Sequence, residues 1–115
     1  MSGDQYQAAA ARTLIDGTDR TLTGAPLMAV WTALGLTGEA GEVAERVKKG
    51  VLHGHGVDVA ELTEELGDVL WYVAALAKVY NLSLSDVMAA NVAKLDRRYP
   101  NGFSVADSIA RRDKE

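Results

Sequence analysis

Four acidic side chains lie in two otherwise apolar stretches of the sequence, in two pairs. Their positions are Glu39, Glu42, Glu65 and Asp68. The first pair holds the only charges in residues 27–43, and Asp68 is the only charge in residues 66–77. A spacing of three places both members of each pair on one face of a helix. Carboxylates among apolar residues are costly unless they are paired, hydrogen-bonded or bound to a metal ion.

The two pairs can meet if the helices that carry them run antiparallel. Residues 43–64 separate the pairs, which is enough for the end of one helix, a turn and the start of the next. Four facing carboxylates would repel unless a divalent cation lay between them. All-oxygen ligation suits Mg²⁺, with Mn²⁺ as a substitute. The residues alone leave two interpretations open, a metal site and two solvated acidic helix faces.

Other potential ligands are weighed against this metal site. A di-iron carboxylate bundle requires Glu-x-x-His twice, and no histidine here follows a glutamate by three positions, so that class is excluded. Glu45, Glu61 and Glu64 are expected to be solvated or to support the ligands from outside. His53 and His55 lie in a glycine-rich segment and are expected at the surface.

A basic face is predicted on a later helix. Asn91, Lys94 and Arg98 fall at positions i, i+3 and i+7. The two cations could clamp phosphate oxygens, and the amide could bind a sugar or base, as a polyphosphate beside divalent metal requires. The alternative is a solvated basic helix end near the negative end of the helix dipole.

The aromatic side chains nearest the acidic pairs, which could stack on a base or pack in the core, are Trp31, Trp71 and Tyr72.

Capping and turn residues divide the chain into five predicted helices. Their ranges are 5–15, 26–49, 59–80, 83–98 (or from 85) and 104–112. The expected N-caps are Asp4, Asp58, Ser83 or Ser85, and Ser104. Gly50 is expected just past the end of the second helix. Gly35, Gly38 and Gly41 recur every three residues and could permit close approach of another backbone. No stretch alternates between apolar and polar residues, so the predicted fold is all-α.

Composition places these elements in one domain, residues 1–115, of 12.3 kDa. The absence of cysteine excludes disulfide scaffolds, thiolate zinc sites and cysteine nucleophiles. The net charge is −4, and residues 39–68 hold eight acids against three bases, which argues against nucleic-acid binding. The first residues lack the basic and apolar regions of a secretory signal, and no apolar run suits a membrane span. A cytoplasmic location is therefore expected.

Three stretches together resemble a known family. They are LGLTGEAGEVAE at residues 34–45, EELGDVLWY at residues 64–72 and NVAKLDRRYPNGFS at residues 91–104. This pattern resembles the MazG-like nucleoside triphosphate pyrophosphohydrolases, over about residues 27–104. The resemblance implies an antiparallel, four-helix-bundle-like all-α fold with short terminal helices, which assembles into homodimers or homotetramers. It also implies Mg²⁺-dependent cleavage of a (d)NTP between the α- and β-phosphates. Removal of damaged nucleotides and control of a nucleotide pool are both compatible with this activity.

The resemblance also implies roles for particular residues. The metal ligands and catalytic residues become Glu39, Glu42, Glu65 and Asp68, and the substrate contacts Asn91, Lys94 and Arg98. Some family members carry an extra carboxylate directly before the first ligand, where this chain has Gly38. The general base is therefore left open between Glu39, Glu42 and water on the metal.

Rival functions are a narrow dUTP or dCTP hydrolase, a phosphoribosyl-ATP pyrophosphohydrolase, and a catalytically silent helical binding module.

Overall fold

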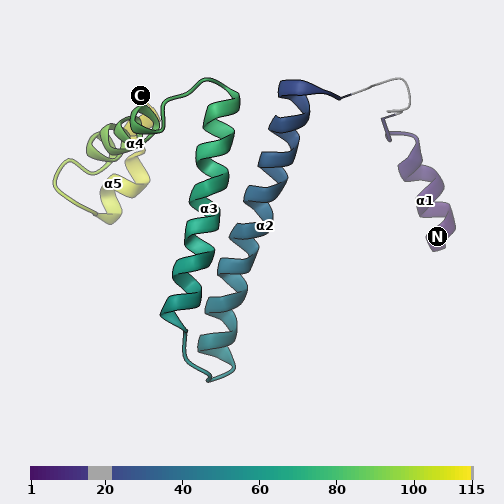
Figure 1. Cartoon of the computed structure of the whole chain (residues 1–115), viewed down its shortest axis with the longest axis horizontal. Coiled ribbons are helices and arrows are strands. Elements are labelled where there is room, and N and C mark those ends of the chain that lie inside the picture. The colour runs from purple at the N-terminus through teal and green to yellow at the C-terminus, as the bar shows by residue number, and fades with distance from the viewer. Residues whose placement is uncertain (16–21, 115) are drawn as a thin grey trace.

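The computed structural model of the chain describes residues 1–15 and 22–114. These residues form five α-helices and a short 3-10 turn, and they contain no β-strand (Figure 1). The elements are α1 (Gly3–Ala11), α2 (Gly24–Leu52), α3 (Val59–Val79), α4 (Leu84–Arg98), α5 (Val105–Ala110) and η1 (Arg112–Lys114). The predicted all-α fold is therefore confirmed.

Helices α2 and α3 lie side by side and antiparallel, and they form the main packed unit of the chain (Figure 1). At Gly35 of α2, the ring of Tyr72 from α3 occupies the space that a Cβ atom would fill. The sequence predicted that another backbone would approach the three spaced glycines closely, and at Gly35 this is wrong, because the nearest atoms belong to the Tyr72 side chain. The prediction is also wrong for Gly38 and Gly41, because an added Cβ at either would meet nothing within 4 Å.

The ends of α2 differ from the sequence prediction. The helix begins two residues before Pro26, and it continues through Gly50 to Leu52. Gly50 is buried there because the returning chain passes over it, and an added Cβ would lie 2.8 Å from the carbonyl oxygen of Gly56. The Gly56 N–H donates a hydrogen bond of 2.9 Å to the Gly50 carbonyl. Gly50 therefore permits close packing of the turn and does not end the helix.

Side-chain caps set most of the helix starts. The confirmed N-caps, each accepting hydrogen bonds from first-turn N–H groups, are Asp58, Ser83 and Ser104. At the first helix the prediction of Asp4 is wrong, because Ser2 caps that helix in a reciprocal pair with Gln5. The helix consequently starts earlier than predicted and ends at Ala11.

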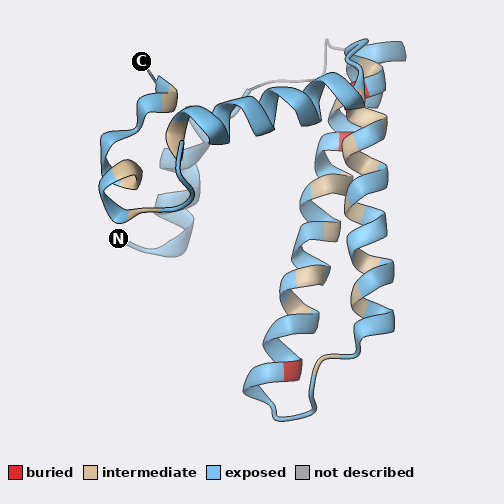
Figure 2. Cartoon of the chain, turned by 90° about the vertical axis from the view of Figure 1, so that its left-hand side faces the viewer, coloured by how far each residue is buried: buried red, intermediate tan, exposed pale blue. Residues whose placement is uncertain are grey.

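Burial within a single chain is slight. Among the described residues, the buried ones are Thr32, Gly50 and Ala77 (Figure 2). Large apolar side chains stay open to solvent, with Leu34 68% exposed and Leu70 63% exposed. The radius of gyration is 20.2 Å, against about 13 Å for a compact domain of roughly 100 residues. The apolar faces therefore have no cover within one chain.

The remaining helices extend away from the α2/α3 pair. Helix α1 lies to one side, and α4 lies on the other side with α5 and η1 packed against it (Figure 1). Within the described part of one chain, the antiparallel bundle thus consists of α2 and α3. No helix in the described part is long and apolar enough to cross a membrane.

Candidate metal centre

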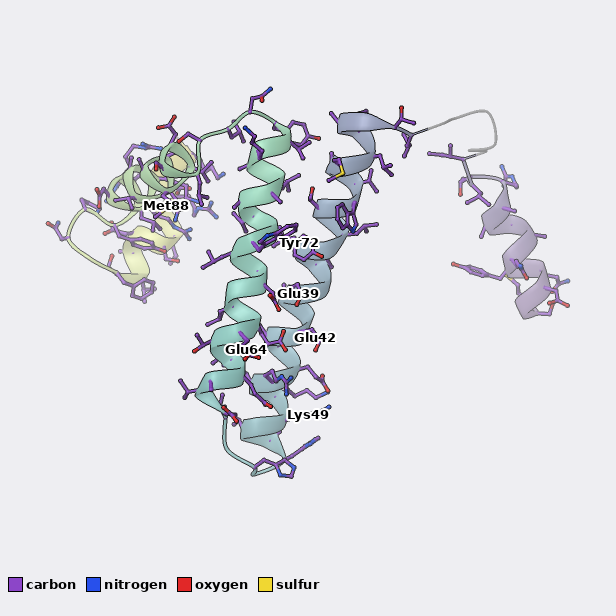
Figure 3. The ribbon with its side chains drawn as sticks, viewed as in Figure 1. Glu39, Glu42, Lys49, Glu64, Tyr72 and Met88 are labelled. Carbon is purple, nitrogen blue, oxygen red and sulfur yellow. The ribbon has the colours of Figure 1, made fainter. Side chains whose placement is uncertain are left out.

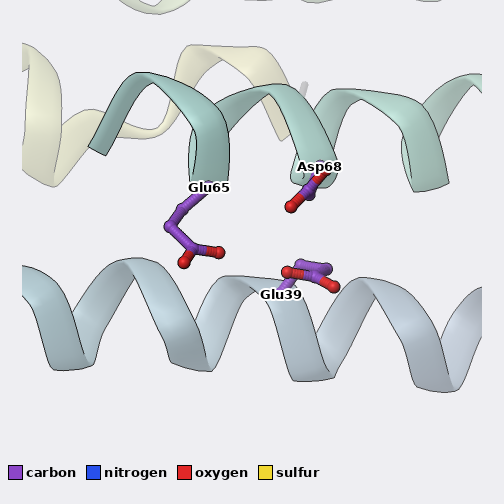
Figure 4. A group of neighbouring side chains, drawn as sticks. All are labelled: Glu39, Glu65 and Asp68. Atoms are coloured by element: carbon purple, nitrogen blue, oxygen red, sulfur yellow. The ribbon is translucent and has the colours of Figure 1, made fainter. Parts of the chain in front are cut away.

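Three carboxylates meet in the space between α2 and α3. Glu39 comes from α2, while Glu65 and Asp68 come from one face of α3 (Figure 4). One oxygen from each side chain lies within 4.8 Å of the chosen oxygens of the other two. Glu39 and Glu65 are half-buried, and Asp68 is exposed. The expectation that antiparallel helices bring acids from both pairs together is confirmed for these three.

The electrostatics of this group favour a cation. The pKa of Glu39 is raised above its ordinary value, first by desolvation and then by the negative charges of Asp68, Glu65 and Glu42. A hydrogen bond with Glu65 raises the pKa of Glu39 further. Hard divalent cations prefer oxygen donors, and every donor in the group is a carboxylate oxygen. The residues present therefore fit Mg²⁺ or Mn²⁺.

The fourth predicted ligand, Glu42, lies one helical turn from Glu39 in the direction of the hairpin turn (Figure 3). Its oxygens are not part of the group of three. It lines instead a cavity of about 450 Å³ that also has Arg46 and Lys49 in its wall. The role of Glu42 as a metal ligand stays a prediction.

Arg46 links the two helices beside the carboxylate group. Its Nη1 donates to Glu61 at 2.8 Å, and its Nη2 and Nε donate to Oε1 of Glu65 at 3.3 and 3.4 Å. Arg46 was not among the residues predicted for the site. Two spacings in the sequence could have revealed this contact. Arg46 follows Glu39 by seven residues and so shares its helical face, and Glu61 and Glu65 lie one turn apart on the facing helix.

An aromatic wall adjoins the carboxylates. A cavity of about 350 Å³ is lined by Glu39, Asp68, Trp71 and Tyr72. The two aromatic rings meet edge to face, with centroids 4.9 Å apart. Trp71 remains 56% exposed, so it is available to a ligand, whereas Trp31 is 52% exposed but does not line this cavity.

The predicted basic face lies apart from the carboxylates within one chain. Asn91 and Lys94 are exposed on α4, and neither lines the two cavities described above. Arg98 packs over the Tyr99 ring, 5.1 Å from its centroid, and its Nε lies 3.9 Å from Oδ1 of Asp113. That Nε is buried without a hydrogen-bond partner. The structure therefore joins the acidic residues to one another but does not join the basic residues to them.

The fold and the site together define a class, an all-α protein with a carboxylate group able to hold a divalent cation between two antiparallel helices. Residues 31–103 match the MazG nucleotide pyrophosphohydrolase domain. The chain therefore belongs to the MazG nucleotide pyrophosphohydrolase family, as the motifs predicted. The matched segment runs from α2 through α4 and includes the whole carboxylate group.

Two relatives extend this result. Gene 37 protein of Mycobacterium phage L5 is 40% identical over 109 residues, which cover 89% of this chain and 92% of that protein. YvdC of Bacillus subtilis (strain 168), a protein described as uncharacterized, is 51% identical over 39 residues, which cover 34% of this chain and 37% of that protein. No solved structure matches the chain.

Proposed function

We propose that the protein is a Mg²⁺-dependent nucleoside triphosphate pyrophosphohydrolase that cleaves a (d)NTP to (d)NMP and pyrophosphate. The observation that carries the proposal is the carboxylate group of Glu39, Glu65 and Asp68 beside an aromatic cavity, in a chain of this family. A nucleoside triphosphate has a polyanionic end that can bind at a cation site and a base that can stack on an aromatic surface. One ligand could therefore occupy both parts of the site.

The metal would be held by Glu39, Glu65 and Asp68, with Glu42 one turn away as the predicted fourth ligand and Mn²⁺ as a substitute. A bound divalent ion supplies charge neutralisation for the triphosphate and acidifies water. Since Gly38 offers no carboxylate, the proposed proton acceptors are Glu39 and Glu42, with water on the metal ion as the alternative nucleophile that needs neither. In the metal-free chain, the raised pKa of Glu39 makes its carboxylate a stronger proton acceptor than an ordinary glutamate.

The base is proposed to stack on the aromatic wall. Trp71 and Tyr72 line the same cavity as Glu39 and Asp68, which places an aromatic surface directly beside the proposed phosphate end of the substrate. Trp31 stays a predicted contact from the neighbouring helix. Stacking discriminates poorly between bases, because every base has an aromatic face, so a panel of nucleotides is needed to find the preferred one.

The phosphate contacts are proposed to come from α4 of a second copy. Within one chain, Asn91, Lys94 and Arg98 lie on a helix that is separate from the α2/α3 pair. The same chain leaves apolar side chains open along α2, α3 and α4, for example Leu34, Leu70 and Met88 (Figure 3 shows the last on α4).

Apolar faces of this extent are covered in a folded protein, and a homodimer would cover them with equivalent surfaces. We therefore propose a homodimer, with a homotetramer as the larger alternative. The remaining expectations, a single domain over residues 1–115 and a cytoplasmic location without nucleic-acid or membrane partners, stand as predictions of the composition.

The test is a panel of dNTPs, NTPs and phosphoribosyl-ATP with Mg²⁺, in which the products are separated and identified. We expect NMP or dNMP with pyrophosphate. Release of NDP and orthophosphate would overturn the proposed bond. Turnover of dUTP, dCTP or phosphoribosyl-ATP alone would establish one of the narrow alternatives. No turnover, together with a thermal shift on adding Mg²⁺ and a non-hydrolysable nucleotide, would favour the silent binding module.

A further inference from the structure

We infer that Arg46 is a positioning residue that holds the carboxylate of Glu65 toward Glu39 and Asp68. The inference rests on the proposed function, in that Glu65 is taken to bind the metal ion. It assigns to Arg46 a role in metal affinity that reaches beyond the joining of two helices.

The contacts of Arg46 are those of a clamp. Two of its nitrogens, Nη2 and Nε, converge on the single atom Oε1 of Glu65, and Nη1 is held at 2.8 Å by Oε2 of Glu61. A planar guanidinium presents its donors in a fixed fork, so fixing one end to Glu61 fixes the direction of the other. Glu65 is only 14% exposed, whereas Glu61 is 50% exposed. Glu61, which fixes the guanidinium, therefore faces solvent, and Glu65, whose side chain is restrained, faces the other two carboxylates.

The charges explain why such a clamp is needed. Glu65 lies beside two other carboxylates, and like charges would turn a free glutamate side chain outward into water. Among the described residues, Arg46 is the one base that forms an ion pair with a member of the group of three. Neighbouring lysines do not replace it, because Lys48 and Lys49 both pair with Glu45.

Two other roles for Arg46 make different predictions. If Arg46 only repels the cation, its removal should tighten metal binding, because a positive charge is lost beside the site. If Arg46 only joins α2 to α3, its removal should lower thermal stability and leave the metal affinity unchanged. If Arg46 positions Glu65, its removal should weaken metal binding, because residues that orient metal ligands typically contribute roughly 10- to 100-fold to affinity.

The experiment measures Mn²⁺ and Mg²⁺ dissociation constants of the full chain by calorimetry, at a temperature where every variant is folded by circular dichroism. The variants are Arg46→Gln, Arg46→Lys and the matched control Lys48→Gln, which removes the same charge from the same helix. We expect Arg46→Gln to weaken Mn²⁺ binding about tenfold. Arg46→Lys should restore only part of this, since an ammonium has no fork, and Lys48→Gln should bind at least as tightly as the wild type.

A second variant, Glu61→Gln, tests the clamp from its far end. It should weaken Mn²⁺ binding when Arg46 is present and have a smaller effect in the Arg46→Gln background. Unchanged or tighter binding by Arg46→Gln overturns the inference while leaving the metal centre in place. A wild-type chain that binds neither ion overturns the proposed metal centre and, with it, this inference.

Discussion

The α2/α3 hairpin and the C-terminal arm, residues 84–114, treat their charged residues in opposite ways. In the hairpin, carboxylates far apart in sequence are brought together by packing of two antiparallel helices. In the arm, cations pair with acids, as Arg112 does with Asp107 at 2.6 Å and Arg98 with Asp113 at 3.9 Å. The described chain thus brings the proposed metal ligands together by itself, whereas we propose that the phosphate contacts come from a second copy.

The largest expected effect comes from removing a ligand in the hairpin. Asp68→Asn deletes a negative charge without changing the size of the side chain, so the proposed metal ion loses a ligand. We expect turnover of the preferred nucleotide to fall by about 100-fold or more. Glu64→Gln, an exposed acid on the same helix outside the carboxylate group, is the matched control and should retain activity. Retained activity in Asp68→Asn would show that the metal assignment is wrong.

The next effect tests the arm. Lys94→Gln removes a proposed charge-assisted contact with phosphate, and we expect KM to rise about tenfold or more while the metal affinity of the hairpin stays unchanged. Lys78→Gln, at the end of α3, removes the same charge outside the proposed basic face and serves as the control.

Mixing Asp68→Asn with Lys94→Gln, assayed at a substrate concentration far below KM where both variants are impaired, separates the two halves of the site. A dimer that combines Asp68→Asn with Lys94→Gln would have one site with both defects and one with neither, if α4 of one copy completes the site of the other. Equimolar subunits that exchange freely should then recover about a quarter of the wild-type activity. No recovery from exchanged dimers would place both halves in the same chain and break the comparison.

The hairpin was more predictable from sequence than the arm, for physical reasons. Glu39, Glu65 and Asp68 are charges in apolar stretches, and such residues carry a strong signal because burial without a partner is costly. Helix capping at Asp58 was also local, and it was predicted correctly. Gly50 was misinterpreted because its small size serves a contact with the returning chain, which no local pattern specifies.

The sequence patterns around Arg46 and in the C-terminal arm were less informative. Arg46 resembles any solvated helix cation until the facing helix is placed, because its partners Glu61 and Glu65 come from another element. The basic face of α4 was visible as a spacing, but in the proposed dimer the position of Lys94 relative to the carboxylates would depend on contacts between chains, which one sequence does not describe.

The next smaller effect concerns the packing of α2 against α3. Gly35→Ala places a Cβ where the Tyr72 ring lies, so either the ring or the two helices must shift. We expect a loss of about 1–3 kcal/mol in the free energy of unfolding, together with weaker metal binding. Gly41→Ala is the matched control on the same helix, because its Cβ meets nothing within 4 Å. It should stabilise the chain by up to about 1 kcal/mol through helix propensity. Equal losses in both variants, measured by chemical denaturation, would mean that a second copy covers Gly41 or that Tyr72 moves freely.

The smallest effect contrasts the pH dependence of the two regions. In the metal-free protein the pKa of Glu39 is raised, chiefly by desolvation, so the native state binds more protons and stability falls as pH rises from the ordinary glutamate pKa through the raised value. The pKa of Asp113 is lowered, chiefly by its hydrogen bond from Arg111, so its stabilisation is present above the ordinary aspartate pKa and is lost as pH falls through the lowered value.

Glu39→Gln should therefore raise the melting temperature of the metal-free protein at neutral pH, and Asp113→Asn should lower it. Both differences should fade in acid, because the carboxyl group is then protonated in the folded and unfolded states alike. Saturating Mg²⁺ should reverse the sign for Glu39→Gln, since the wild type alone keeps the full ligand set, and should leave Asp113→Asn unaffected. Melting curves across pH, with and without Mg²⁺, test this contrast. Two variants that respond alike to Mg²⁺ would remove the distinction between the hairpin and the arm.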